Sequence, residues 1–164
     1  MTRFEPGFLD KLFDDDARGP ASPVLRSHSI GEMKNAVARD IEALLNTRMV
    51  FTDEALEGFP ECERSVVTFG LNDFSGRSLA SHDDREFVCS SIRNAIDRHE
   101  KRLSNVSVTL MLDSQSDTQV LYFGITALLT LSHLQEPVQF DATLQPTTLQ
   151  YSVSRGVGKA RNDG

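Results

Sequence analysis

The spacing of apolar residues along this chain changes near residue 103, and this change most limits the folds that the chain can adopt. Before it, apolar residues recur every three or four positions, as in amphipathic helices. After it, apolar and polar residues alternate over 106–112, 121–129 and 138–144, as in strands with one buried face. We expect an α+β domain in which helices cover the apolar face of an antiparallel sheet.

Two main helices are expected before the sheet. The first begins at Ser29, which forms an S-x-x-E capping box with Glu32, and covers residues 30–46. The second begins near Ser81 and ends around Glu100, with its apolar residues at helical spacing. Both helices are expected to pack on the sheet.

The sheet is expected to be an antiparallel meander of three strands, or of four. Beyond Pro146, Leu149, Tyr151 and Val153 alternate with polar residues, and we expect them to continue the third strand. No Lys or Arg occurs from Leu103 to Tyr151, although edge strands are usually protected by such charges. Either the chain covers its own sheet edges, or one edge receives a strand from another chain.

One domain between two tails accounts for a chain of 164 residues that is 39% hydrophobic. We assign 1–27 to a short N-terminal helix and linker, 28–153 to the domain and 154–164 to a flexible tail. Residues 47–80 show no long period, and we expect an irregular segment anchored by the apolar residues Val66, Val67, Phe69 and Leu71. The N-terminal helix must dock on its own domain or on a partner, because ten residues are marginal alone. Its apolar side consists of Phe4, Phe8, Leu9, Leu12 and Phe13.

Charge and cysteine content exclude several classes of protein. With 17 Lys+Arg against 24 Asp+Glu, the net charge is -7, which disfavours nonspecific binding to nucleic acid or to anionic membranes. The longest apolar stretch, 120–131, is about half of the ~20 residues that a membrane-spanning helix needs. No secretory signal is visible, and Cys62 and Cys89 are expected to be free thiols rather than a disulfide. We therefore expect a soluble, cytoplasmic protein.

Signatures of catalysis, cofactors and metals are lacking in the sequence. It has no phosphate-binding loop or dinucleotide fingerprint, and its four histidines are not at metal-ligand spacing. The best enzymatic alternative is a glycosidase with Glu100 as general acid and Asp113 or Asp117 as the second carboxylate. However, the adjacent Lys101 and Arg102 favour a charged Glu100. We expect a protein that is not an enzyme and has no cofactor.

Four stretches, in order along the chain, resemble one family. They are residues 7–13 (GFLDKLF), 37–48 (VARDIEALLNTR), 65–74 (SVVTFGLNDF) and 92–103 (IRNAIDRHEKRL). Together they resemble TssE, the baseplate wedge component of the type VI secretion system, which is related to the lysozyme-like wedge proteins of contractile-tailed phages. The resemblance covers residues 7–150.

This resemblance implies a structural role at the cytoplasmic face of the inner membrane, with TssF, TssG and TssK as partners. It also implies a part in starting the sheath of TssB and TssC. Glu100 and Arg102 match the Glu and Arg that bind neighbouring wedge proteins in the family, although an internal pair tying helix to strand is the alternative. Here Lys101 replaces the usual Pro and His99 the usual aromatic residue. The stripe of Phe8, Leu9, Leu12 and Phe13 is a second candidate for partner binding.

Overall fold

The computed structural model describes residues 29–51, 54–63, 65–74, 76, 81–111, 120–131, 134–145 and 147–156. The expected α+β class is confirmed, whereas the N-terminal stripe lies outside the described residues. The helices are α2 (Ile30–Leu45), η1 (Glu54–Leu56), α3 (Pro60–Glu63), η2 (Val66–Thr68) and α4 (His82–His99). The strands are β1 (Leu103–Met111), β2 (Leu121–Leu131), β3 (Leu134–Gln145) and β4 (Gln150–Arg155).

The expected capping box is present at the start of α2. The Glu32 main-chain N–H donates to Ser29 Oγ at 3.2 Å, and the Ser29 N–H donates to Glu32 Oε2 at 2.7 Å. Asn46 caps the C-terminal end, so the helix ends at Leu45, one residue earlier than expected. Helix α4 has acidic residues in its first turn and Arg98 and His99 in its last, an order that complements the helix dipole.

The sheet is fully antiparallel in the order β1-β2-β3-β4. Our expectation that Leu149, Tyr151 and Val153 continue the third strand is wrong. Leu149 has φ 54°, and its N–H donates to the Gln145 carbonyl at 2.8 Å, so the chain reverses. Tyr151 then pairs with Leu144, so the odd-numbered apolar residues of β4 face the same side as the even-numbered ones of β3. Strand β4 also extends two residues beyond the expected domain end at 153.

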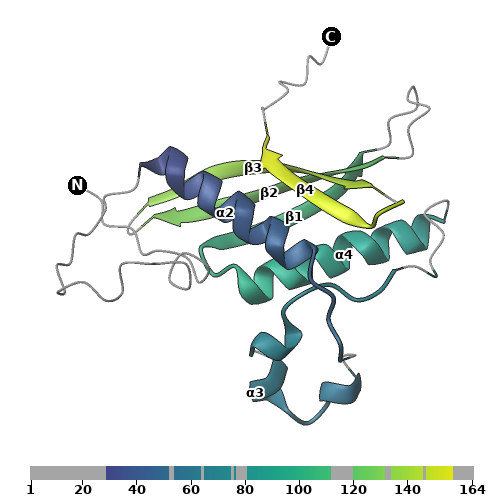
Figure 1. Ribbon diagram of the computed structural model, residues 1–164. Coiled ribbons are helices and arrows are strands. Elements are labelled where there is room, and N and C mark those ends of the chain that lie inside the picture. Colours follow the sequence, from purple (N-terminus) through teal and green to yellow (C-terminus); the bar gives the residue numbers. More distant parts are fainter. Residues whose placement is uncertain are drawn as a thin grey trace, which may run out of the picture.

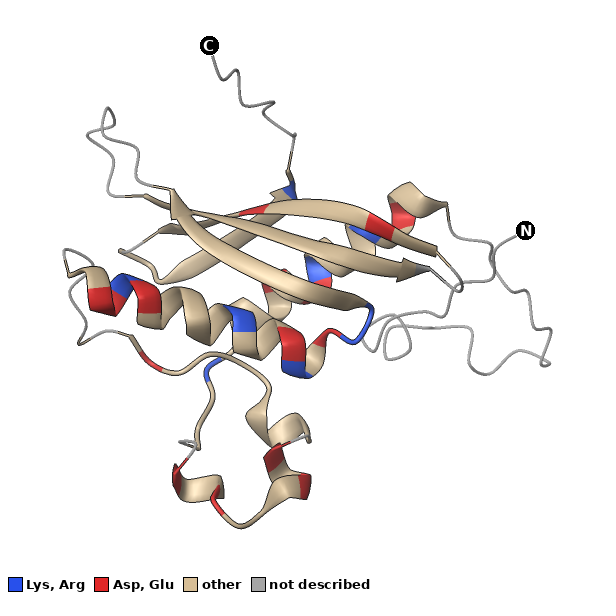
Figure 2. Cartoon of the chain, turned by 180° about the vertical axis from the view of Figure 1, so that it is seen from behind, with Lys and Arg blue, Asp and Glu red and all other residues tan. Residues whose placement is uncertain are grey.

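Both main helices cover one face of the sheet, α2 beside β4 and α4 beside β1 (Figure 1). Phe123, Ile125 and Phe140 from the middle strands are fully buried against apolar residues of both helices, including Ile41 and Ile92. The other face carries mainly Ser, Thr and Gln, and few charges appear on the strands (Figure 2). Among the described residues, no helix is long and apolar enough to cross a membrane.

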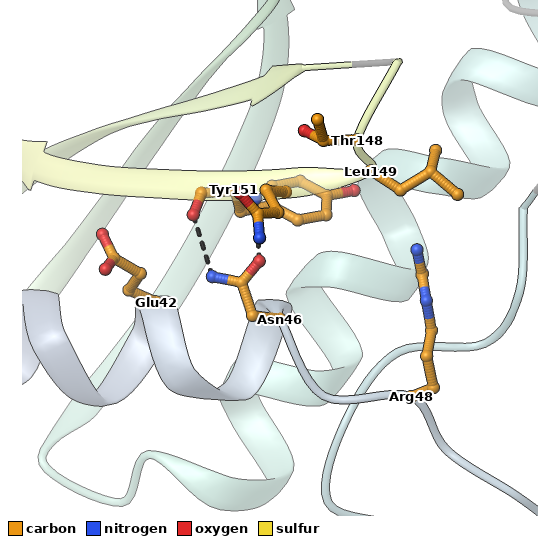
Figure 3. Close-up of a pocket in the computed structure, with 7 residues that line it drawn as sticks. Glu42, Asn46, Arg48, Thr148, Leu149 and Tyr151 are labelled. Carbon is orange, nitrogen blue, oxygen red and sulfur yellow. Dashed lines mark hydrogen bonds between the residues drawn. The ribbon is translucent and has the colours of Figure 1, made fainter.

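The two outer strands differ in how their edges are protected. On β4, Asn46 at the end of α2 bonds both main-chain groups of Tyr151, each at 2.8 Å (Figure 3). Glu42 accepts from the Val153 N–H at 2.7 Å. On β1, the register shifts between Ser104 and Ser107, as in a β-bulge. The chain therefore covers the β4 edge with its own helix, and bends β1 near its start.

Between α2 and α4 the chain makes an excursion, which we define as residues 49–70. Its ends are joined by two hydrogen bonds of 2.9 Å, from the Met49 N–H to the Leu71 carbonyl and from the Leu71 N–H to the Thr47 carbonyl. Leu71 is buried and Phe69 packs against the core, as expected for anchoring residues. Val66 and Val67 are instead exposed, because the short helix η2 turns them outward. Our expectation for these two valines is wrong.

Candidate protein-binding site

Helix α4 leads directly into β1 through a short, well-bonded exit. The Glu100 N–H donates to the Ile96 carbonyl at 2.8 Å and ends the helix. The Leu103 N–H then donates to the Glu100 carbonyl at 3.1 Å, and the Arg102 carbonyl accepts from Thr130 of β2 at 2.8 Å. This backbone fixes the positions from which Glu100 and Arg102 extend their side chains.

The side chains of Glu100, Arg102 and Asp40 form a charged triad. Arg102 Nε donates to Glu100 Oε1 at 2.7 Å, while its Nη2 donates to both Glu100 Oε2 and Asp40 Oδ2. The triad is largely buried, with side-chain exposures of 9% for Glu100, 12% for Asp40 and 18% for Arg102. Burial alone would lower the pKa of Arg102, but its bonds and charge pairing with the two carboxylates raise it, so the guanidinium stays charged.

The structure brings Glu100 and Arg102 together, as the sequence predicts, and adds Asp40 from α2. The triad ties α2 to the junction of α4 and β1, so the internal pairing that we considered is present. The third nitrogen of the guanidinium, Nη1, does not bond either carboxylate of the triad. Among the described residues its recorded contact is Met33 Sδ at 3.9 Å, which is a weak acceptor. Nη1 thus makes no charge-assisted hydrogen bond among the described residues.

The remaining candidates from the sequence are residues that the structure does not describe, together with Glu100 as a general acid. Phe8, Leu9, Leu12 and Phe13 lie outside the described residues, as do Asp113 and Asp117. Both oxygens of Glu100 accept hydrogen bonds from Arg102, and the residue is only 7% exposed. Within the described part of the chain, no three His, Cys, Asp or Glu residues are grouped to hold a metal ion. Cys62 and Cys89 are free thiols, as expected.

Comparison with known protein families identifies the family to which this chain belongs. The family model described as baseplate wedge protein gp25 matches residues 31–133, more than half of the chain. The chain belongs to the gp25 baseplate wedge family. No individual curated protein matched the chain.

Membership gives this gp25-family protein a structural role in a baseplate, with protein partners in that complex. The matched region includes α2, the excursion, α4, β1 and β2, and therefore all three residues of the triad. Strands β3 and β4 lie beyond the match. The earlier resemblance of the sequence to a baseplate wedge component is thus confirmed at the level of the family.

A second polar contact in this gp25-family protein joins the end of α4 to the excursion. His99 Nε2 lies 2.8 Å from the Thr68 carbonyl oxygen and 3.1 Å from Thr68 Oγ1. A bond to a carbonyl requires this nitrogen to carry the proton. The His99 ring also contacts Phe69 edge to face, with ring centroids 5.4 Å apart. His99 therefore combines a ring contact with a hydrogen bond at the end of α4.

The stability of the protein is expected to fall as the pH decreases through about 6.5. Burial lowers the pKa of His99, and the neighbouring Arg98 and Lys101 add to this effect, while the bond to Thr68 opposes it. Because the folded pKa is below the unfolded value of about 6.5, the unfolded state binds the proton more readily. Neutral His99 therefore stabilises the fold above this pH, and the stabilisation is lost below it.

Urea unfolding between pH 7.5 and 5.5 measures this dependence. His99→Gln should flatten the slope of unfolding free energy against pH, because glutamine does not titrate. His82→Gln, at an exposed position in the first turn of α4, is the matched control and should leave the slope unchanged. An unaltered slope in His99→Gln would mean that another group sets the pH dependence.

Proposed function

We propose that this protein is a type VI secretion baseplate subunit of the TssE kind, which joins the wedge to the contractile sheath and helps to start sheath assembly. The match to the gp25 wedge family over residues 31–133 is the observation that carries this proposal. The proposed partners are TssF and TssG in the wedge, TssK nearby, and the sheath subunits TssB and TssC. The proposed location is the cytoplasmic face of the inner membrane.

The triad is the proposed contact with TssF and TssG. Asp40 and Glu100 hold the Arg102 guanidinium in one orientation, so little conformational freedom is lost when a partner binds. An acceptor on the partner then takes a charge-assisted hydrogen bond from Nη1. In this arrangement the internal ion pairs and the partner contact use different nitrogens of one side chain. The N-terminal stripe, Phe8, Leu9, Leu12 and Phe13, is the proposed second contact.

The affinity of purified TssF–TssG for paired variants tests the triad. Arg102→Lys keeps the charge but loses the planar fork, and we expect binding to weaken by about tenfold, the loss of roughly one charge-assisted bond. Asp40→Asn is the matched control, because it also disturbs the triad but leaves Arg102 bonded to Glu100. It should be destabilised, and because Glu100 still orients the guanidinium, it should bind more tightly than Arg102→Lys does. Equal affinities for wild type and Arg102→Lys would contradict the proposed contact.

The β1 edge is the proposed site at which a sheath strand adds. The β4 edge is closed by Asn46 and Glu42, as described above. On β1, the Leu110 N–H faces the sulfur of Cys89 in α4, which is at most a weak acceptor. Val108 lies two residues away, so its main-chain groups point to the same outer side.

Val108→Pro removes one outward N–H from this edge, and proline is tolerated on edge strands. Val108→Thr keeps the N–H and the branched side chain, and is the matched control. With fluorescent TssB in living cells, we expect Val108→Pro to reduce the number of sheaths roughly tenfold, since strand addition depends on main-chain bonds. Val108→Thr should assemble sheaths normally. Normal assembly with Val108→Pro would exclude strand addition at β1.

A lysozyme-like hydrolase with Glu100 as the acid remains the alternative function. A general acid must reach a substrate oxygen. Here both carboxylate oxygens bond Arg102 and the residue is buried, so the geometry favours a structural role for Glu100 over a catalytic one.

A further inference from the structure

Large apolar side chains are exposed on the excursion, where the core does not need them. Val50 is 84% exposed, Phe59 62% and Val66 71%, and Phe51 and Val67 are also exposed. Figure 1 shows this segment projecting away from the layers of sheet and helices. Single exposed hydrophobic residues are common, but a group of five on one projecting segment is typical of an interaction site.

The excursion is held in shape by its own contacts. Leu56 is buried within it, the Phe59 N–H donates to the Leu56 carbonyl at 2.9 Å, and the Cys62 N–H donates to the Phe59 carbonyl at 2.9 Å. Thr68 Oγ1 donates to the Glu63 carbonyl at 2.9 Å, and His99 connects the same threonine to α4. Phe59 is therefore presented from a folded segment, which lowers the entropy that a partner must remove on binding.

The charge around these apolar residues is acidic. Figure 2 shows acidic and no basic residues on the described part of the excursion. Arg48 comes directly before it in the sequence. In the whole excursion the sequence has Arg64 as its single basic residue. An acidic surface is repelled by anionic lipid and by nucleic acid, so these phenylalanines do not suit either ligand. The exposed glutamates are Glu54, Glu57, Glu61 and Glu63.

We propose that the excursion docks a neighbouring protein subunit that presents an apolar pocket rimmed by Lys and Arg. Phe59 is the anchor that enters the pocket, since buried aromatic residues dominate such contacts. Glu57 and Glu61 lie on either side of it in sequence and pair with the basic rim, which sets orientation and excludes acidic partners. This surface lies on a different segment from Arg102, so it does not depend on which subunit binds the triad.

Photo-crosslinking in cells tests this proposal on the full chain. The photoreactive residue p-benzoylphenylalanine replaces Phe59, and the crosslinked peptides are sequenced by mass spectrometry. The same chain then carries either Glu57→Lys with Glu61→Lys, or the control pair Glu86→Lys with Asp97→Lys on exposed positions of α4. Both pairs change the net charge equally, and thermal unfolding confirms that each chain is folded.

We expect one protein adduct whose crosslinked peptide has more Lys and Arg than Asp and Glu. Its yield should fall roughly tenfold with reversal at Glu57 and Glu61, and should be unchanged in the control pair. Four results would each overturn the proposal: no adduct, an adduct with lipid, an acidic crosslinked peptide, or an adduct yield that does not change when Glu57 and Glu61 are replaced by lysine. The effect of Arg102→Lys on TssF–TssG binding tests the contact at the triad and leaves the proposal for the excursion unaffected.

Discussion

Replacing Arg102 by alanine is expected to lower the free energy of unfolding by about 3–5 kcal/mol. The variant leaves Glu100 and Asp40, both largely buried, without the cation that lies between them. Uncompensated buried charge is among the most destabilising changes known in proteins. Urea denaturation of the purified chain at pH 7 measures the loss.

A triple variant separates this charge effect from lost packing. Arg102→Met with Asp40→Leu and Glu100→Met replaces all three charges by apolar groups, and should lie within about 1–2 kcal/mol of wild type. A loss below about 1 kcal/mol in Arg102→Ala would mean that the triad behaves as a solvated surface pair. If the large loss is found, the alanine variant is a poor probe of partner binding, and Arg102→Lys with its Asp40→Asn control should be used instead.

Gly70→Ala is expected to destabilise the protein by about 3 kcal/mol or more, because two costs add at this position. Gly70 has φ +129°, a conformation that side chains rarely adopt. A Cβ atom there would also lie 2.6 Å from the Thr47 carbonyl oxygen, at the bonds that join the two ends of the excursion. Backbone atoms cannot move aside as a flexible side chain does.

Gly58→Ala is the matched control within the same excursion. Gly58 has φ +91°, but no atom lies within 4 Å of the added Cβ, so only the backbone strain of about 1–2 kcal/mol is expected. Urea denaturation gives both losses, and hydrogen exchange at the Met49 and Leu71 amides reports whether the ends of the excursion separate. Equal losses in the two variants would show that close approach to Thr47 is unimportant.

Local rules in the sequence predicted the elements that depend on neighbouring residues. The capping box at Ser29 and Glu32 located the start of α2, and the alternation after residue 103 identified the sheet. We missed the turn before β4, although the sequence carried a sign of it: the apolar residues are at even positions up to Leu144 and at odd positions from Leu149. In one continuous strand Leu144 and Tyr151 would face opposite sides, and they share a face only because the chain returns. A positive φ at Leu149 is also not expected for such a residue.

The candidate site was only partly predictable for a related reason. Glu100 and Arg102 are two positions apart at a helix end, and their resemblance to a family motif identified both. Asp40 is 62 positions from Arg102, and only packing of α2 against the α4–β1 junction brings them together. A signal was available, since Asp40 precedes the buried Ile41 and lies within the stretch 37–48 that resembles the family. The exposure of Val66 and Val67 depends on the short η2 helix, which has no period to detect.

Sheath assembly in living cells tests the proposed baseplate role most directly. The gene is deleted from the organism that carries it, TssB is made fluorescent, and sheaths are counted before and after the wild-type gene is returned. If this protein joins the wedge to the sheath, sheaths should disappear on deletion and return with the gene. Sheaths that form at the normal frequency without the gene would contradict the proposed role.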